Sequence, residues 1–279
     1  MNIIETITKS DKNISDNTSN IQRISLDKLR TNPIPNNKNE IWRLTNKSKF
    51  NRFLDFKFTN DFYDPDIPGY SNIGNICRII IGENKRIKLK RENWEIKELE
   101  EKEIQNFLQQ KIIKSDTTQN WSNLLNHFLT DNKNIIGLNI SGKEIPPLEI
   151  ICNSKNNFLN AKTLIINIEE DTIVSISQIN IGDKNSALSI SSYFNIAQHS
   201  VLNHGIISYG KNKANIINTL NVWQHKNSEY NLGSLQFEYD FGRFEISINQ
   251  VEGNAKTNIK GIQITKNNEQ ISTYANIEF

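Results

Sequence analysis

Residues 172–194 read TIVSISQINIGDKNSALSISSYF. Two runs in this stretch, TIVSISQI and ALSISSYF, alternate apolar and polar residues, and a short turn with Gly, Asp, Lys and Asn separates them. Alternation with a period of two and an excess of β-branched residues are typical of strands that bury one face. The stretch therefore predicts two strands joined by a brief turn.

Similar runs recur from about residue 132 to the end of the sequence. They include TLIINI (163–168), VLNHGIIS (201–208), ANIINTLNV (214–222), SLQFEYDF (234–241), RFEISINQ (243–250), TNIKGIQIT (257–265) and QISTYANIEF (270–279). Strands that are so numerous and so evenly spaced indicate a sandwich, a barrel or a β-solenoid, and the lack of helical segments between them disfavours a doubly wound α/β fold. Hairpin turn pairs such as Asn-Gly are scarce and no proline follows Pro147, so the pattern favours a β-helix.

The first part of the chain has a different pattern. Residues 1–31 are polar and rich in Asn and Ser, so we expect a frayed terminus there. Residues 40–57 have the composition of a helix start, and the apolar run at 76–81 that of a strand. Two amphipathic helices are expected next, with apolar faces formed by Ile104, Phe107, Leu108 and Ile112 and by Trp121, Leu124, Leu125 and Phe128. We therefore predict a helical or mixed N-terminal region at 1–131 and a β-helix at 132–279, in a mainly β protein.

Charge and hydropathy exclude several classes of partner. The 33 basic and 31 acidic residues leave a formal net charge of +2, which predicts no nucleic-acid or anionic-membrane partner. No stretch approaches the apolar length of a membrane helix, and the N-terminal residues have no apolar signal segment, so we expect a cytoplasmic protein. We interpret the abundance of Asn, Ile and Lys as the footprint of an AT-rich genome.

The residues that usually carry chemistry form no known motif. His199 and His204 are five positions apart, and an odd difference places them on opposite faces of one continuous strand unless a turn intervenes. Cys77 and Cys152 lie in apolar runs and are expected to be buried, reduced thiols. The sequence contains no HExxH, CxxC, Walker-type or GxSxG motif. On residues alone, the chain is a β-rich protein that we expect not to be an enzyme.

Three segments, taken together, resemble one family. The first, NEIWRLTN, contains an E-x-W-R-x-T pattern at Glu40, Trp42, Arg43 and Thr45. The second carries Asn126, Phe128, Asp131, Glu144, Pro147 and Ile150, and the third carries Arg243, Gly253, Ala255 and Gly261. In this order and at this spacing they are similar to SufD, in the SufB/SufD family of the Suf iron–sulfur cluster assembly system. Asn132 stands where the family usually has Gly, and Ile259 where it has Leu.

The resemblance implies a right-handed parallel β-helix after the N-terminal region. In the family, a C-terminal helical domain follows, so we expect this chain to lack the C-terminal third of a family member. SufD in the family is a non-catalytic subunit whose β-helix pairs with SufB and whose C-terminal domain holds the ATPase SufC. The resemblance therefore implies no cofactor bound by this chain alone, because the complex as a whole handles the iron–sulfur cluster.

Two other interpretations stay open at this point. A SufB-like scaffold subunit shares the β-helix, but Cys77 and Cys152 have no spacing that suggests cluster ligands. A β-helix enzyme acting on polysaccharide needs clustered carboxylates, and a single sequence shows no such cluster. Within the SufD-type interpretation, we expect Trp42 to pack the N-terminal region onto its neighbours and Arg43 to pair with a carboxylate or a backbone carbonyl group.

Overall fold

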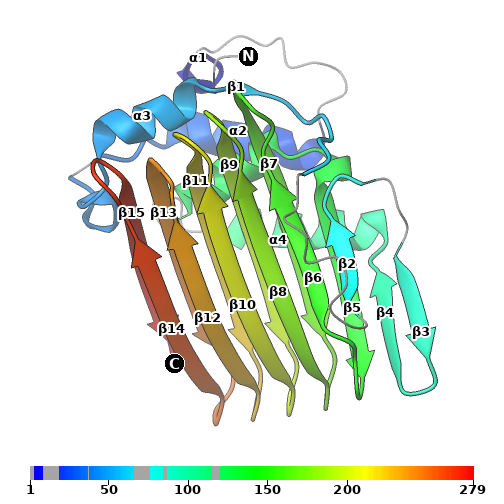
Figure 1. The fold of residues 1–279 in the computed structure, drawn as a ribbon. Helices are drawn as coiled ribbons and strands as arrows, with labels where there is room; N and C mark the ends of the chain where they lie inside the picture. The colour runs from blue at the N-terminus through cyan, green and yellow to red at the C-terminus, as the bar shows by residue number, and fades with distance from the viewer. Residues whose placement is uncertain (1–2, 9–18, 37, 66–75, 84–86, 115–119) are drawn as a thin grey trace.

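A computed structural model describes residues 3–8, 19–36, 38–65, 76–83, 87–114 and 120–279 (Figure 1). The second half of the chain forms a parallel β-solenoid of about five turns, as the sequence predicts. Its strands are β5 (Ile135–Gly142), β6 (Leu148–Asn153), β7 (Phe158–Ile168), β8 (Ile173–Gly182), β9 (Ala187–Ile196), β10 (Val201–Gly210), β11 (Asn215–Gln224), β12 (Glu229–Phe237), β13 (Phe241–Gln250), β14 (Lys256–Ile264) and β15 (Gln270–Glu278).

Successive strands alternate between two sheets, so each turn of the solenoid adds one strand to each sheet. The nine-stranded sheet has the order β15-β13-β11-β9-β7-β5-β4-β3 with β1 beside β7, and the six-stranded sheet has the order β14-β12-β10-β8-β6-β2. Leu159 lies opposite Ala187, and Ala187 lies opposite Asn215, so a turn here takes 28 residues. Parallel pairing in register keeps the side chains of paired residues on the same face of the sheet, so like side chains stack in turn after turn.

Inward side chains of the two sheets form the solenoid core. Phe194, Val222 and Ile248 lie side by side on β9, β11 and β13, and each is at most 1% exposed. The alternation predicted for the last strand is also present, since Ile271 and Ile277 of β15 pack against this core. The aliphatic ladders remove apolar surface from water along the whole axis of the solenoid, which stabilises the stack.

The turns of the solenoid contain residues with a left-handed backbone. These residues are Glu144, Asn157, Asp171, Asn185, His199, Asn212, Lys213, Asn227, Glu238, Asn254 and Asn267. Asn accepts positive φ more readily than most non-glycine residues because its short side chain makes local hydrogen bonds. Part of the Asn content, which the sequence analysis attributed to genome composition, therefore has a structural role.

The N-terminal region contributes strands as well as helices. Four of its strands, β1 (Lys57–Phe58), β2 (Cys77–Ile80), β3 (Lys88–Arg91) and β4 (Trp94–Glu98), join the two sheets. β2 continues the six-stranded sheet in parallel, whereas β4 pairs with β5 in antiparallel fashion and β3 pairs with β4. Sheet pairing therefore begins well before residue 132.

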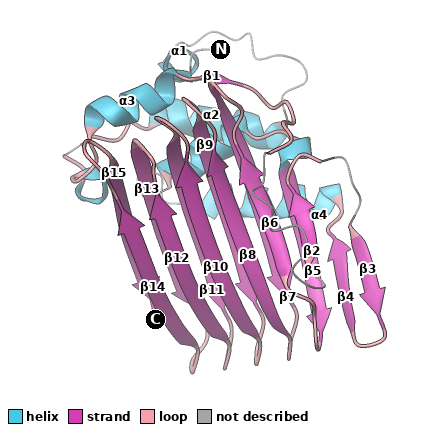
Figure 2. Ribbon diagram, in the orientation of Figure 1, coloured by secondary structure: helices cyan, strands magenta, loops and turns pink. Residues whose placement is uncertain are grey.

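The helices cover one face of the solenoid, the outer face of the nine-stranded sheet (Figure 2). They are α1 (Ile3–Thr8), α2 (Asn20–Thr31), η1 (Glu40–Trp42), α3 (Lys47–Asp55), α4 (Glu101–Lys114), α5 (Trp121–Leu129) and η2 (Asn132–Asn134). A second core cluster joins helical residues such as Leu26, Phe53 and Leu125 to Ile165 and Ile217 of the sheet.

One expectation for the N-terminal region is wrong, and another is confirmed. Residues 20–31 were expected to be frayed, but they form α2, which begins with a capping box between Ser19 and Gln22 and buries Leu26 and Leu29. The predicted helix start at 40–57 is a 3₁₀ turn at Glu40–Trp42 followed by α3. Both elements depend on tertiary contacts that a polar sequence does not reveal.

The turn geometry gives a stability prediction. Asn227 has φ 59° and an exposed side chain in the turn between β11 and β12. Asn227→Val should lower the free energy of unfolding by about 1–2 kcal/mol, because a β-branched residue is strained at positive φ, whereas Asn227→Gly should change it little. Urea unfolding of both variants measures this, with Lys226→Val as the control at a neighbouring exposed position.

Candidate functional site

The motif residues at the two ends of the sequence meet on the outer face of the nine-stranded sheet. Trp42 and Thr45 come from the segment around η1, and Arg243 comes from β13. The guanidinium carbon of Arg243 lies 3.8 Å from the centroid of the Trp42 ring. Its Nη1 donates to Thr45 Oγ1 at 3.0 Å, and its Nη2 donates to the Ile41 carbonyl oxygen at 3.1 Å.

The charge of Arg243 is balanced within the same contact. Arg243 Nε donates to Glu245 Oε1 at 2.5 Å, and Ser122 Oγ of α5 donates to the same oxygen at 2.9 Å. Arg243 is only 2% exposed, and burial of a charge is tolerated where it is paired and hydrogen-bonded. The N-terminal segment, α5 and β13 are therefore joined by one buried polar cluster.

Aromatic rings surround this cluster. The Trp42 ring centroid lies 4.9 Å from that of Phe50 and 6.2 Å from that of Trp121, and Phe50 lies 6.3 Å from Phe241. Edge-to-face and tilted contacts of this kind stabilise a core beyond the area that they bury. Trp42 thus packs the N-terminal region against α3, α5 and β13, as the sequence analysis expected.

α5 is held to the sheet by amide side chains. Asn126 Nδ2 donates to the Lys162 carbonyl oxygen at 3.1 Å, and its Oδ1 accepts from Thr163 Oγ1 at 2.7 Å. One turn earlier, Asn123 Oδ1 accepts from Ser191 Oγ at 2.9 Å and from Thr219 Oγ1 at 2.5 Å. These buried hydrogen bonds fix the register of the helix over β7, β9 and β11, because each amide must meet its own hydroxyl group.

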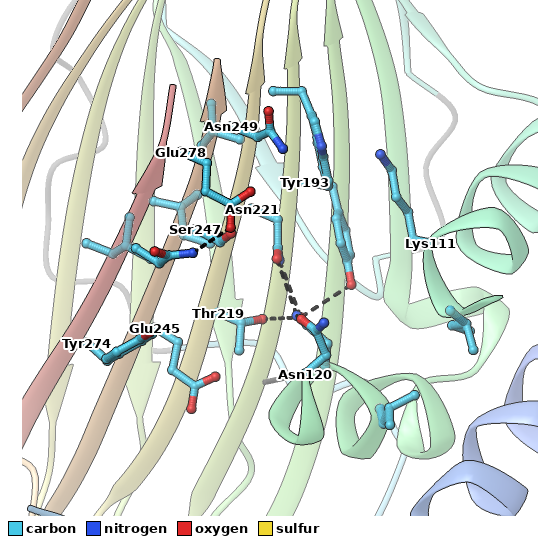
Figure 3. A pocket seen from close by; sticks show the side chains of 18 of the residues that line it. Lys111, Asn120, Tyr193, Thr219, Asn221, Glu245, Ser247, Asn249, Tyr274 and Glu278 are labelled. Atoms are coloured by element: carbon cyan, nitrogen blue, oxygen red, sulfur yellow. Dashed lines mark hydrogen bonds between the residues drawn. The ribbon is translucent and has the colours of Figure 1, made fainter. Parts of the chain in front are cut away.

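A cleft of about 460 Å³ opens beside the contact between α5 and the sheet (Figure 3). Its floor consists of three ladders across β11, β13 and β15, which are Thr219–Glu245–Tyr274, Asn221–Ser247–Asn276 and Trp223–Asn249–Glu278. Lys111 of α4 closes one side, with its Nζ 3.2 Å from the Trp223 ring centroid. The ladders bring hydroxyl, amide and carboxylate groups into a cleft that is also lined by apolar residues such as Leu220 and Ile246.

His127 lies at the inner end of the cleft. Its Nε2 is 2.6 Å from the Tyr193 hydroxyl group, and its ring stacks on the Tyr193 ring at 5.6 Å. Burial lowers the pKa of His127 from 6.5 to about 3, because the imidazolium form would lose its hydration. Burial likewise raises the pKa of Tyr193, so both groups are neutral at physiological pH.

The other family-motif residues lie outside this cluster. Glu40 and Arg43 are exposed, and among the described residues Arg43 has neither the ion pair nor the side-chain hydrogen bond that we expected. The carbonyl oxygen of Pro147 accepts from the Cys77 backbone N–H at 3.1 Å. Phe128 is 7% exposed on α5, whereas Gly253 and Ala255 lie between β13 and β14 and Gly261 lies in β14.

The histidines and cysteines do not converge. His199 lies in the turn before β10, so the single continuous strand considered for it is absent, and His204 points into the solenoid core beside Tyr230. Both cysteines are free thiols, with Cys152 buried and Cys77 half-buried. Within the part of the chain that the structure describes, no three His, Cys, Asp or Glu side chains are placed to hold a metal ion.

Glu245, Ser122 and Asn123 are the residues of this site that the sequence analysis missed. Glu245 stands two residues after Arg243 on β13, so both point to the same side of the sheet. That spacing is visible in the sequence. The convergence of Ser122 and Asn123 on the same face required the fold, because they come from a helix far away along the chain.

The protein is a parallel β-solenoid, and the buried hydrogen bonds of α5 fix its helical cover to one of the two sheets. Residues 150–279 match the family model described as SUF system FeS cluster assembly, SufBD core domain. The match runs from β6 to β15, and it supports membership of the SufB/SufD family and a role in iron–sulfur cluster assembly. No curated protein and no solved structure gives a significant match to this chain. No helix in the described ranges has the length and apolar character needed to span a membrane.

Trp42 gives the first test of the site. Trp42 is 2% exposed, so Trp42→Ala should lower the free energy of unfolding by about 3–5 kcal/mol through lost burial and a residual cavity. Leu44→Ala is the control, because Leu44 is 75% exposed two residues away. Thermal and urea unfolding measure both variants, and an unchanged melting temperature for Trp42→Ala would contradict the packing described above.

His127 gives a prediction of pH dependence. Its folded-state pKa, about 3, lies below its unfolded value of 6.5, so the unfolded chain binds the proton first as the pH falls. The stability that neutral His127 provides is complete above pH 6.5 and declines below it. Between pH 7 and pH 5 the free energy of unfolding of the wild-type chain should therefore fall by about 2 kcal/mol more than that of His127→Gln. Urea unfolding at the two pH values measures this difference. If wild type and His127→Gln lose the same free energy of unfolding between pH 7 and pH 5, His127 is not buried in its neutral form.

Proposed function

We propose that this chain is a SufD-type, non-catalytic subunit of an iron–sulfur cluster assembly complex, which pairs with SufB and works with the ATPase SufC. The observation that carries the proposal is the SufBD core match, which spans residues 150–279 and with them most of the solenoid. The three motif segments favour the SufD type. The cluster is cargo of the complex in this proposal, and the chain acts in the cytoplasm.

In this proposal, the edge strands β14 and β15 are the surface that pairs with a second β-helix. Among the described strands, β15 pairs only with β13, and β14 pairs only with β12. An open row of backbone N–H and C=O groups binds another strand by extending the ladder. A partner with the same fold therefore meets both edge strands with main-chain hydrogen bonds and apolar stacking.

The N-terminal region reinforces the end of the solenoid. Gln270 at the start of β15 accepts from the Asn46 backbone N–H at 3.0 Å and donates to the Leu44 carbonyl oxygen at 2.7 Å. Lys49 and Arg52 of α3 each lie 2.7 Å from a carboxylate oxygen of Asp240. In the proposal, these contacts keep the last turns in place for the partner, so that the edge is preformed before binding.

A SufB-type subunit is the alternative within the same family. The three motif segments resemble SufD, whereas the SufBD core model describes both types. Co-purification separates the two assignments. A SufD-type chain associates with SufB, whereas a SufB-type chain associates with the SufD of the same organism instead.

The direct test is co-purification of the full-length protein with SufB and SufC from the same organism, under reducing and low-salt conditions. The Gln270 backbone N–H donates to the Asp240 carbonyl oxygen, so the even-numbered residues of β15 face β13 and the N–H of Ala275 faces the free edge. Ala275→Pro should remove an edge donor without breaking the β13 ladder, and it should lower SufB recovery at least several-fold. Ala275→Ser is the matched control. Failure of both SufB and SufC to associate with the full-length wild-type protein would refute the proposal.

A further inference from the structure

The outer face of the six-stranded sheet is uncovered over β8, β10, β12 and β14. We call this surface, formed by the outward side chains of those four strands, the open face. The helices contact β7, β9, β11 and β13 of the other sheet, and Figure 1 shows them on the far side of the solenoid. Within the described part of the chain, no helix covers the open face, so this sheet surface is in contact with solvent.

An aliphatic ridge crosses the open face. Ile179, Ile207, Leu235 and Ile262 lie opposite one another on the four successive strands. Ile207 is 41% exposed and Ile262 is 62% exposed. In the next ladder, the rings of Tyr209 and Phe237 stack with centroids 5.9 Å apart. Contiguous apolar surface of this kind is typical of an interaction site rather than of a free surface.

A trough runs beside the ridge on β8, β10 and β12, two residues away along each of these strands, and Lys260 of β14 is the next residue in the same register. It consists of Ser177, Gly205 and Gly233, which are in register on β8, β10 and β12. A Cβ atom added at Gly233 would meet nothing within 4 Å, and one added at Gly205 would meet only the Ser177 hydroxyl group at 3.9 Å. Neither glycine has positive φ, so local backbone geometry does not require them.

Charge is depleted on the same surface. The outward side chains of β8 and β10 include no charged residue, and on β12 and β14 the charged ones are Glu229, Lys256 and Lys260. Depletion of charge at the centre of an apolar patch is the composition of an interface core. A polyanion or an anionic membrane would require a basic surface, which the centre of this face does not provide.

We propose that the open face binds the open face of a second copy of this chain. The ridge and the trough are neighbours and run in the same direction, so a two-fold axis places the ridge of each copy in the trough of the other. Four strands about 4.8 Å apart, each with about nine residues at about 3.3 Å, give about 600 Å² for each copy. The total of about 1,200 Å² reaches the lower limit of stable, specific interfaces.

This contact is independent of the SufD-type proposal. It uses the face of one sheet, whereas the pairing with SufB proposed above uses the strand edges at the end of the solenoid. Both contacts can form at once because they involve different surfaces of the chain. Substitutions on the open face therefore leave the edge intact, and Ala275→Pro leaves the open face intact.

Sedimentation velocity of the full chain over a concentration series, up to a few hundred micromolar, tests the proposal. The wild-type chain should dimerise with a Kd of tens of micromolar or below. Gly233→Arg fills the trough with a charge and Ile207→Lys interrupts the ridge, and each should raise the Kd at least tenfold. Gly253→Arg is the matched control, since a Cβ atom there also meets nothing within 4 Å but lies in the turn between β13 and β14.

Two results would overturn the inference. One is a wild-type chain that stays monomeric over the whole series, including the case in which it binds vesicles of anionic lipid instead. The other is a dimer that Ala275→Pro abolishes and that Gly233→Arg leaves unchanged, because the strand edge would then be the contact. Circular dichroism and melting temperatures confirm in parallel that each variant is folded.

Discussion

Register between successive turns is the constraint on which the rest of this structure depends. Leu159, Ala187 and Asn215 stand opposite one another because the chain returns to the same position after each turn. Left-handed residues such as Asp171, His199 and Asn227 let each turn close within a few residues, so that paired strands stay in register. A slip of one residue would move every aliphatic side chain from the core to the surface, so the stack tolerates little variation.

The same stacking produces faces with different properties. Inward positions form the aliphatic core, and the outward positions of the nine-stranded sheet alternate apolar residues with small hydroxyl and amide groups. α5 binds that surface through Asn123 and Asn126. Their amide oxygens accept hydrogen bonds from the hydroxyl groups of Thr163, Ser191 and Thr219. A helix docked only by apolar contacts could slide along a regular sheet, whereas paired hydrogen bonds allow one position.

Arg243 links the two halves of the chain in a single buried contact. It stacks on Trp42, bonds to Thr45 and pairs with Glu245, which also accepts from Ser122. Arg243 and Glu245 both belong to β13, so the two buried charges balance within one strand. The N-terminal segment completes the contact with the Trp42 ring, the Thr45 hydroxyl group and the Ile41 carbonyl oxygen. The motif residues that resemble SufD thus act first as structural partners. Within the proposed complex, their role is to hold the solenoid end and its edges in a defined shape.

Local sequence patterns indicate the class of fold. Period-two alternation, even strand spacing and the lack of hairpin turn pairs lead to a β-helix, because each reflects local backbone geometry and burial of one strand face. The faces of QISTYANIEF and the two amphipathic helices follow from the same local rules. Several features of the protein depend on tertiary contacts and not on these local rules. The tertiary structure placed Arg243 over Trp42, formed α2 from a polar segment, drew β2 and β4 into the sheets and left the ridge of Ile207 uncovered. These features depend on contacts between residues far apart along the chain, and no short stretch of sequence specifies its distant partner.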